Sequence, residues 1–303
     1  MKATHIAARD GFARADEIAA VTDFDGAWQV EGHGPQLRAV RAAAEGLRER
    51  LVRGPRTVSV RSLPITTLGY PTKYGFGGAA LSPAPWLIMT HRCLLVQFLQ
   101  RGELKTLMFN PTDDVAARKT PFFERTIRQF GDYIAFNLLA KRFDSLEHQL
   151  AALGVTRESV DYVAFDHFHT QDFRGLLGTQ DAAHAPRFPN AKLLAQRAEW
   201  DDWDDLHPLQ RAWYVADGKA TVRTNQVVLL DGDFELGDGV MLLRTPGHTS
   251  GNQTLFVNTP DGIWGSSENG ISADNWSPHE SRISGLARTA RMQDLDVIPN
   301  SNT

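Results

Sequence analysis

The chain has 303 residues, of which 42% are hydrophobic and 22% charged, and its formal net charge is −4. This composition is ordinary for a globular protein with a buried core, and the absence of a basic patch argues against a nucleic-acid partner. No stretch approaches the roughly 18 apolar residues of a membrane span and the first residues lack the apolar core of a secretory signal, so we expect a cytoplasmic protein with no membrane partner.

The single cysteine, Cys93, rules out an internal disulfide and lies in the apolar run 93–96. This position is typical of a small buried hydrophobe, so we do not expect Cys93 to act as a nucleophile. One cysteine is compatible with a reducing compartment.

Residues 1–80 are predicted to form a partly helical N-terminal extension. Apolar residues at spacings of three and four draw one helix face, at Leu37, Val40, Ala44, Leu47 and Leu51. Gly54-Pro55 ends this helix, and the alternating residues 57–61 predict a strand. The glycine- and proline-rich stretch 64–85 is either a long loop near a binding cleft or a plain connector.

Residues 81–303 are predicted to form the main domain. Strands are expected at 86–90 and 93–99, followed by a hairpin turn at Arg101-Gly102-Glu103 into a strand at 104–109. Helices are expected over 121–142 and 145–153, the second with Asp144 or Ser145 as its N-cap and Gly154 at its end. Further strands are predicted at 160–165, 188–195, 227–230, 240–243 and 254–257. Two groups of strands with helices between and after them indicate an α+β or a layered α/β/β/α arrangement.

The first chemical motif is Asp-His-Phe-His-Thr-Gln-Asp at residues 166–172, directly after an apolar strand. In extended backbone, residues i and i+2 point to one side, so His167 and His169 can present two imidazoles to one point. Two neutral imidazoles at that spacing suit a Zn²⁺-like ion.

The second motif is Thr-Pro-Gly-His-Thr-Ser-Gly at residues 245–251, a tight turn after the strand at 240–243. By itself His248 reads as a hydrogen-bonded turn residue. Together with His167 and His169 it becomes the natural third ligand of a metal ion.

From about Trp86 to its end, the chain resembles the metallo-β-lactamase superfamily. That family carries His-x-His-x-Asp-His after a buried strand and a second motif similar to Thr-Pro-Gly-His-Thr-x-Gly, and both occur here in the right order. The stretch 188–193, Glu199 and the run 236–243 also look like the family. The resemblance implies a metallo-β-lactamase-like αββα sandwich, with residues 1–80 as an addition that has no counterpart.

The chain departs from the family pattern at the usual second metal site. Gln171 and Asp172 stand where the family has Asp-His, and Asp172 is the candidate replacement ligand. A serine, Ser266, occupies the position of the bridging aspartate, and Glu268 and Asn269 are the candidates to reach the metal instead. Ser301 or Asn302 takes the place of the last family histidine.

We therefore expect one divalent ion rather than two, with zinc as the first choice and iron or manganese as alternatives. Three histidines leave a coordination position open for water, whose pKa falls to about 7 in such sites and yields a metal-bound hydroxide. Asp172 or Asp166 would orient that water or act as general base. Asp166 has a second interpretation, as a partner that holds a histidine tautomer.

Other histidines and aromatics are expected to have lesser roles. His279 is a candidate to line the pocket, whereas the remaining histidines are read as surface or structural residues: His91, His148, His184 and His207. The aromatic group Trp200, Trp203, Trp213 and Tyr214 forms either core or the wall of an apolar substrate cleft.

The leading functional hypothesis is a metal-dependent hydrolase that cleaves an ester, lactone or amide of a small molecule. The first alternative is a non-catalytic relative that binds a ligand or serves assembly, because Gln171, Ser266 and Ser301 replace family ligands. Redox chemistry at bound iron ranks last. A homodimer through the N-terminal helix and the 64–85 stretch is a further expectation.

Overall fold

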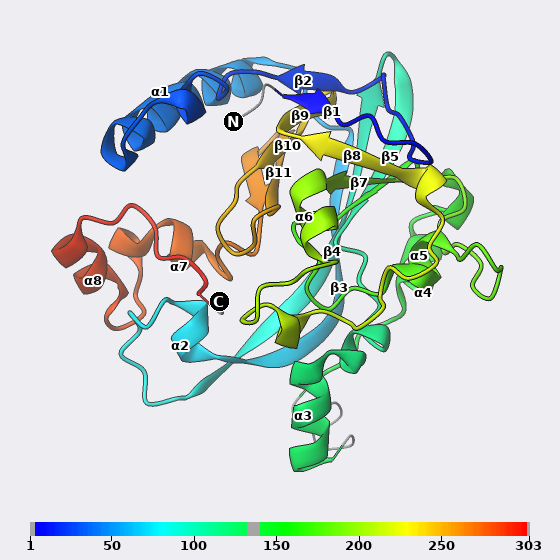
Figure 1. Cartoon of the computed structure of the whole chain (residues 1–303). Coiled ribbons are helices and arrows are strands. Elements are labelled where there is room, and N and C mark those ends of the chain that lie inside the picture. Colours follow the sequence, from blue (N-terminus) through cyan, green and yellow to red (C-terminus); the bar gives the residue numbers. More distant parts are fainter. Residues whose placement is uncertain (1–3, 132–139, 302–303) are drawn as a thin grey trace.

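A computed structural model describes residues 4–131 and 140–301, which form two stacked β-sheets flanked by helices (Figure 1). The first sheet has the strand order β1-β8-β7-β6-β5-β4-β3, and the second has the order β12-β11-β10-β9-β2. The strands are β1 (His5–Ile6), β2 (Ala19–Val21), β3 (Ser59–Pro71), β4 (Trp86–Gln100), β5 (Glu103–Phe109), β6 (Tyr162–Ala164), β7 (Lys192–Gln196), β8 (Val227–Asp231), β9 (Asp233–Gly237), β10 (Val240–Arg244), β11 (Gln253–Thr259) and β12 (Gly262–Ser266). The helices are α1 (His33–Arg53), α2 (Thr72–Gly75), α3 (Pro121–Phe130), α4 (Leu146–Ala152), α5 (Phe173–Leu177), α6 (Arg197–Asp202), α7 (Ala273–Trp276) and α8 (Leu286–Gln293).

The central core fills the space between the sheets. Side chains of β4, β5 and β8 meet those of β9, β10 and β11, including Phe98, Phe109, Phe234 and Val257. In β10, Val240 and Leu242 face this core, while the alternate residues Met241 and Leu243 face the opposite side, as the period of two in a strand requires.

Helices cover the outer faces of both sheets. Helix α1 presents Leu47 and Leu51 to the outward side chains of β10, and α4, α5 and α6 belong to the core on the far side of the first sheet. Figure 1 shows α1 and the pair α4 and α5 on opposite sides of the sheets. This is the αββα layering that the sequence predicts.

Within the described residues 4–80, strands pair in both sheets, which corrects the description of residues 1–80 as an extension. Strand β1 pairs with β8 and β2 pairs with β9, and β3 pairs with β4 from Ser59 to Pro71. A boundary at residue 80 would therefore separate paired strands. The predicted helical part is present as α1 and ends before Gly54, as expected.

Several local predictions are confirmed. The β4–β5 hairpin turns through Arg101 and Gly102, whose φ angles of 52° and 84° are those of a two-residue turn matched to the strand twist. Ser145 caps α4 by accepting the backbone N–H of His148 at 3.2 Å. The helix expected over 121–142 is wrong in its second half: α3 ends at Phe130, Gly131 follows with φ of 79°, and Arg142 forms an isolated bridge with Thr66. Residues 132–139 lie outside the described ranges.

Over the described part of the chain, no helix is both long enough and apolar enough to cross a membrane.

Asp233, at the start of β9, generates a prediction about stability. Its side chain is 3% exposed and accepts the backbone N–H of Arg244 at 2.6 Å. Burial, with added repulsion from Asp25 and Asp23, raises the pKa of Asp233 to about 7, well above the roughly 3.9 of an unfolded aspartate. The folded chain therefore binds an additional proton between those values, and its stability falls as pH rises through about 7.

We expect the unfolding free energy to drop by on the order of 3 kcal/mol between pH 4 and pH 8 because of this group. Asp233→Asn should remove that part of the pH dependence, since an amide oxygen still accepts the Arg244 N–H. Urea unfolding at a series of pH values measures the difference. Asp16→Asn, at an exposed aspartate, is the matched control, and equal slopes for Asp233→Asn and wild type would contradict the prediction.

Candidate metal centre

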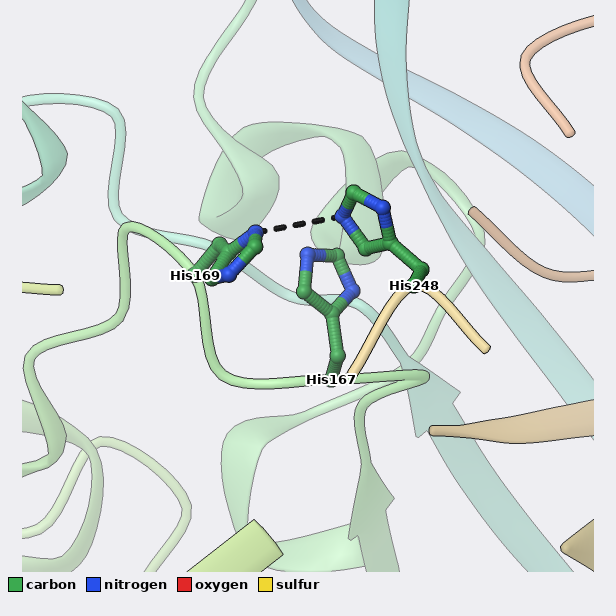
Figure 2. A group of neighbouring side chains, drawn as sticks. All are labelled: His167, His169 and His248. Carbon is green, nitrogen blue, oxygen red and sulfur yellow. Dashed lines mark hydrogen bonds between the residues drawn. The ribbon is translucent and has the colours of Figure 1, made fainter. Parts of the chain in front are cut away.

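Three histidines converge from loops that belong to different sheets. His167 and His169 follow β6 of the first sheet, whereas His248 lies in the turn after β10 of the second. All three are buried, and their ring centroids lie 4.5–4.8 Å apart. Figure 2 shows the rings gathered around one point, which confirms the predicted convergence.

The nitrogen atoms are placed as metal ligands would be. Nδ1 of His169 and Nε2 of His248 are 3.1 Å apart, close to the roughly 3.3 Å edge of a tetrahedron whose metal–nitrogen distances are about 2.0–2.1 Å. One ligand nitrogen from each of the three residues lies within 4.8 Å of the others. The donor set and its spacing therefore fit a divalent cation.

Neighbouring side chains orient two of the rings. Nδ1 of His167 lies 2.8 Å from Oδ1 of Asp166, which leaves Nε2 directed to the cluster. Nε2 of His169 contacts Oε1 of Gln210, so Nδ1 is the nitrogen that faces the other two histidines. A histidine that ligates a metal usually donates its other N–H to an oxygen in this way, so Asp166 fits its second sequence interpretation, as the partner that holds a tautomer.

Burial also sets the protonation of the rings. It lowers the pKa of His169 and of His248 well below the ordinary value, and the neighbouring His167 lowers both further. Burial acts the same way on His167, but the Asp166 carboxylate outweighs it and raises the pKa of His167 to about 9. Two rings are therefore neutral near pH 7, the form in which imidazole binds a metal.

The Glu199 carboxylate ties the two histidine loops together. Glu199 is 1% exposed in α6, and its Oε1 accepts the backbone N–H of Phe168 at 2.9 Å and the hydroxyl of Tyr214 at 2.6 Å. Its Oε2 accepts the Thr249 hydroxyl at 2.6 Å and the N–H of Gly251 at 3.3 Å. One side chain thus holds the residue between the first two histidines and the residue after the third.

Glycines in the second motif make room for these contacts. A Cβ at Gly251 would lie 2.2 Å from the backbone nitrogen of Glu199, and one at Gly247 would lie 2.9 Å from Oδ1 of Asn269. The Asn269 side chain accepts the N–H of His248 and donates to the carbonyl of Thr245, each at 2.8 Å. Asn269 therefore shapes the turn, and its amide is occupied there instead of serving as the metal ligand expected from sequence.

Glu268 lies beside the histidines, as the sequence suggests. Its carboxylate is close to Asp166 and His167, and its backbone N–H donates to Oδ2 of Asp166 at 2.9 Å. Burial and the Asp166 charge raise the pKa of Glu268 to about 7 against the opposing effect of His167. Within residues 4–131 and 140–301, no hydrogen bond to the Glu268 carboxylate is present, so it is available to a ligand in the pocket.

Asp172 is placed away from the cluster, which corrects its assignment as ligand or base. It is the N-cap of α5 and binds Arg174, with Oδ2 2.6 Å from the guanidinium and Lys119 3.7 Å away. Asp172 lines a neighbouring cavity and is not among the residues around the histidine pocket. The cause is local: Thr170 has φ of 65°, so the alternation of an extended strand stops before Asp172.

Three residues are predicted from sequence to stand where the metallo-β-lactamase superfamily has metal ligands, and they lie as follows. The Gln171 amide donates to the Thr112 hydroxyl at 2.9 Å and to the His169 carbonyl at 3.0 Å. Ser266 lies at the end of β12 and lines the pocket. Ser301 donates its N–H to the Tyr74 carbonyl, and Asn302 lies outside the described residues.

His167 and His169 line a pocket of about 270 Å³. One wall is aromatic: Trp213 stacks on Phe122 at 4.4 Å between centroids and lies 6.0 Å from His169. Trp200, Trp203 and Tyr214 pack in the core instead. The strand part of the 64–85 stretch lines the pocket through Thr66, Leu68 and Tyr70, as the cleft interpretation of that stretch predicts.

Two histidines differ from expectation. His279 hydrogen-bonds to the Leu295 carbonyl and is not among the pocket residues. His91, which we read as surface or structural, lines the pocket from β4. Its position within a long strand carries no motif that sequence reasoning could use.

No protein-family model matches the chain. The N-acyl homoserine lactonase of Bacillus thuringiensis is 28% identical over 131 residues, which are 43% of this chain and 46% of the relative. The chain thus matches less than half the length of that curated relative.

Solved structures show a wider likeness. A probable metal-dependent hydrolase from Staphylococcus aureus aligns with a TM-score of 0.52 and 18% identity, over 70% of this chain and 72% of that one. An N-acyl homoserine lactone hydrolase, solved with N-hexanoyl-L-homoserine at its catalytic metal centre, aligns with a TM-score of 0.51 and 18% identity, over 80% of this chain and 88% of that one. At these identities the likeness concerns the fold, and the chain has the metallo-β-lactamase fold that its motifs predict.

Proposed function

We propose that this protein is a metal-dependent hydrolase that opens a lactone or cleaves an ester of a small acyl compound. The observation that carries the proposal is the convergence of His167, His169 and His248, with two ligand nitrogens 3.1 Å apart. Three imidazole nitrogen donors that leave a fourth coordination position open are the arrangement of catalytic rather than structural zinc.

The proposed cofactor is one zinc ion per chain, held by the three histidines. When bound, such a cation polarises a carbonyl and acidifies water at neutral pH. Asp166 holds His167 through Nδ1, and both Asp166 oxygens already accept hydrogen bonds, from His167 and from the Glu268 N–H. Its role in this proposal is therefore to orient a ligand.

Glu268 is the proposed general base. Its carboxylate lies next to His167 in the pocket and is available, so it can take the proton of the attacking water and pass it to the leaving alkoxide. It replaces Asp172, whose carboxylate is occupied by Arg174.

The pocket supports a small substrate with an apolar part. Its aromatic wall of Trp213, Phe122 and Phe123 faces space enough for a short acyl chain beside the histidines. N-acyl homoserine lactones are the first substrates to test, because the partial relatives carry the name of enzymes for that class. The cytoplasmic location and the homodimer stay predictions.

Hydrolysis of N-hexanoyl homoserine lactone by zinc-loaded protein tests the proposal. We expect ring opening that is lost after chelation and restored by added zinc. The reaction is measured by proton release or by chromatography of the product. Binding of the intact lactone to zinc-loaded protein with no turnover would instead favour the non-catalytic relative. Bound iron with a visible absorption band and no hydrolysis would favour redox chemistry.

Substitutions of Glu268 and of Asp172 test which of the two carboxylates is the general base. Glu268→Gln should keep one zinc per chain and lower kcat by about 10²–10⁴-fold, the usual contribution of a general base. Asp172→Asn should retain kcat within a few-fold, because asparagine also serves as an N-cap. Steady-state kinetics with metal analysis decide between them, and the reverse pattern would restore Asp172 as the base.

Glu199 should control metal affinity without touching the metal. In Glu199→Gln, the NH₂ group of the amide faces N–H or O–H groups that now donate hydrogen bonds to the carboxylate. Both histidine loops therefore lose hydrogen bonds that hold them in place. We expect zinc affinity to fall by about 10- to 100-fold, as for other residues that position metal ligands. Competition with a chromogenic chelator measures this affinity. Tyr214→Phe removes only one donor and should cost less. An unchanged zinc affinity in folded Glu199→Gln would refute this role.

A further inference from the structure

His91 is a fourth imidazole in the pocket, outside the ligand set described above. It lies in the middle of β4, opposite Thr66 of β3, and it lines the same cavity as Asp166, His167 and Glu268. It belongs to neither group of side chains that lie close enough together to hold a cation. A role in metal binding is therefore not what its position indicates.

The Nε2 atom of His91 is buried and has no hydrogen-bond partner within the described ranges. The backbone of Asn110 favours a protonated ring nitrogen on His91. Because Nε2 is without a partner, we infer that Nδ1 carries the ring proton. With the proton on Nδ1, Nε2 is left as an acceptor. Burial lowers the pKa of His91 below its ordinary value, so the ring is neutral near pH 7.

Asn110 connects this imidazole to the metal centre. Its φ of 59° places it in the left-handed region, which is uncommon for a residue other than glycine and is often found at functional sites. Its side-chain oxygen accepts the N–H of Asp166 at 3.0 Å, and Asp166 orients His167. Asn110 thus acts on His91 through its backbone and holds the Asp166 backbone through its side chain.

A buried acceptor without a partner is rare in folded proteins and requires an explanation. We propose that Nε2 of His91 accepts a hydrogen bond from an N–H or O–H group of the bound substrate, near the bond that is cleaved. The inference rests on the proposed function and narrows its substrate class. The preferred substrate carries a donor beside its scissile ester, as an acylamino lactone does and a simple alkyl lactone does not.

Two matched lactones test the inference on the zinc-loaded full-length chain. One is N-hexanoyl homoserine lactone, and the other is its analogue in which CH₂ replaces the amide N–H. A site built to bond a donor rejects the analogue that lacks it, because its own polar atom is left unpaired. We expect wild type to prefer the N–H compound by about 10- to 100-fold in kcat/KM.

Substitutions of His91 test whether its imidazole causes the preference for the lactone with the amide N–H. His91→Leu should bring the ratio of the two kcat/KM values close to one, mainly by slowing the N–H compound. His91→Gln keeps an acceptor oxygen and an amide donor for Asn110, so it should retain most of the preference. His148→Leu, at an exposed histidine, is the control and should leave the ratio unchanged. Zinc content is measured for every variant.

The outcomes separate this inference from the proposed function. If wild type hydrolyses both lactones equally, or if His91→Leu slows both to the same extent, the inference is overturned and the hydrolase proposal stands. If wild type hydrolyses neither, the hydrolase proposal fails, and the Kd values of the same two lactones decide about His91. A wild-type preference for the lactone with the amide N–H that His91→Leu abolishes would support the inference, and equal Kd values would overturn it.

Discussion

The structure depends on one buried carboxylate that joins two loops from different sheets. The His167–His169 loop follows β6 of the first sheet, and the His248 turn follows β10 of the second. Glu199 accepts hydrogen bonds from both, and Gln253 adds a cross-sheet link by donating to the Phe165 carbonyl at 2.8 Å. Without such contacts, nothing would hold imidazoles so far apart in the sequence close together in the structure. These contacts within the protein fix the position of one histidine loop relative to the other.

The sequence predicts the convergence of the three histidines because each lies in a short motif with strong local constraints. The i, i+2 spacing places His167 and His169 together, and the Pro-Gly turn reverses the chain directly before His248. The same reasoning fails for Asp172, since a left-handed Thr170 turns the chain and makes the aspartate a helix cap. Alternation holds only where the backbone stays extended.

Other features depend on contacts that no short motif reveals. Residues 1–80 look like an addition because strands β1 and β2 are only two and three residues long, yet both pair with strands from the far end of the chain. His91 lies within an ordinary strand pattern, and its partner Asn110 and the neighbouring Asp166 come from other elements. Gln210, which contacts His169, lies in an acidic, tryptophan-rich stretch that carries no motif. Contacts between residues far apart in the sequence determine where each of these residues lies in the structure.

The central claim is that three imidazoles hold one catalytic cation. Anomalous diffraction at the zinc edge, from crystals grown with zinc, tests it most directly. We predict one strong peak per chain, about 2.0–2.1 Å from Nε2 of His167, Nδ1 of His169 and Nε2 of His248. A peak held by the carboxylates of Asp166 and Glu268 without His169 and His248, or no peak at the histidines, would contradict the account.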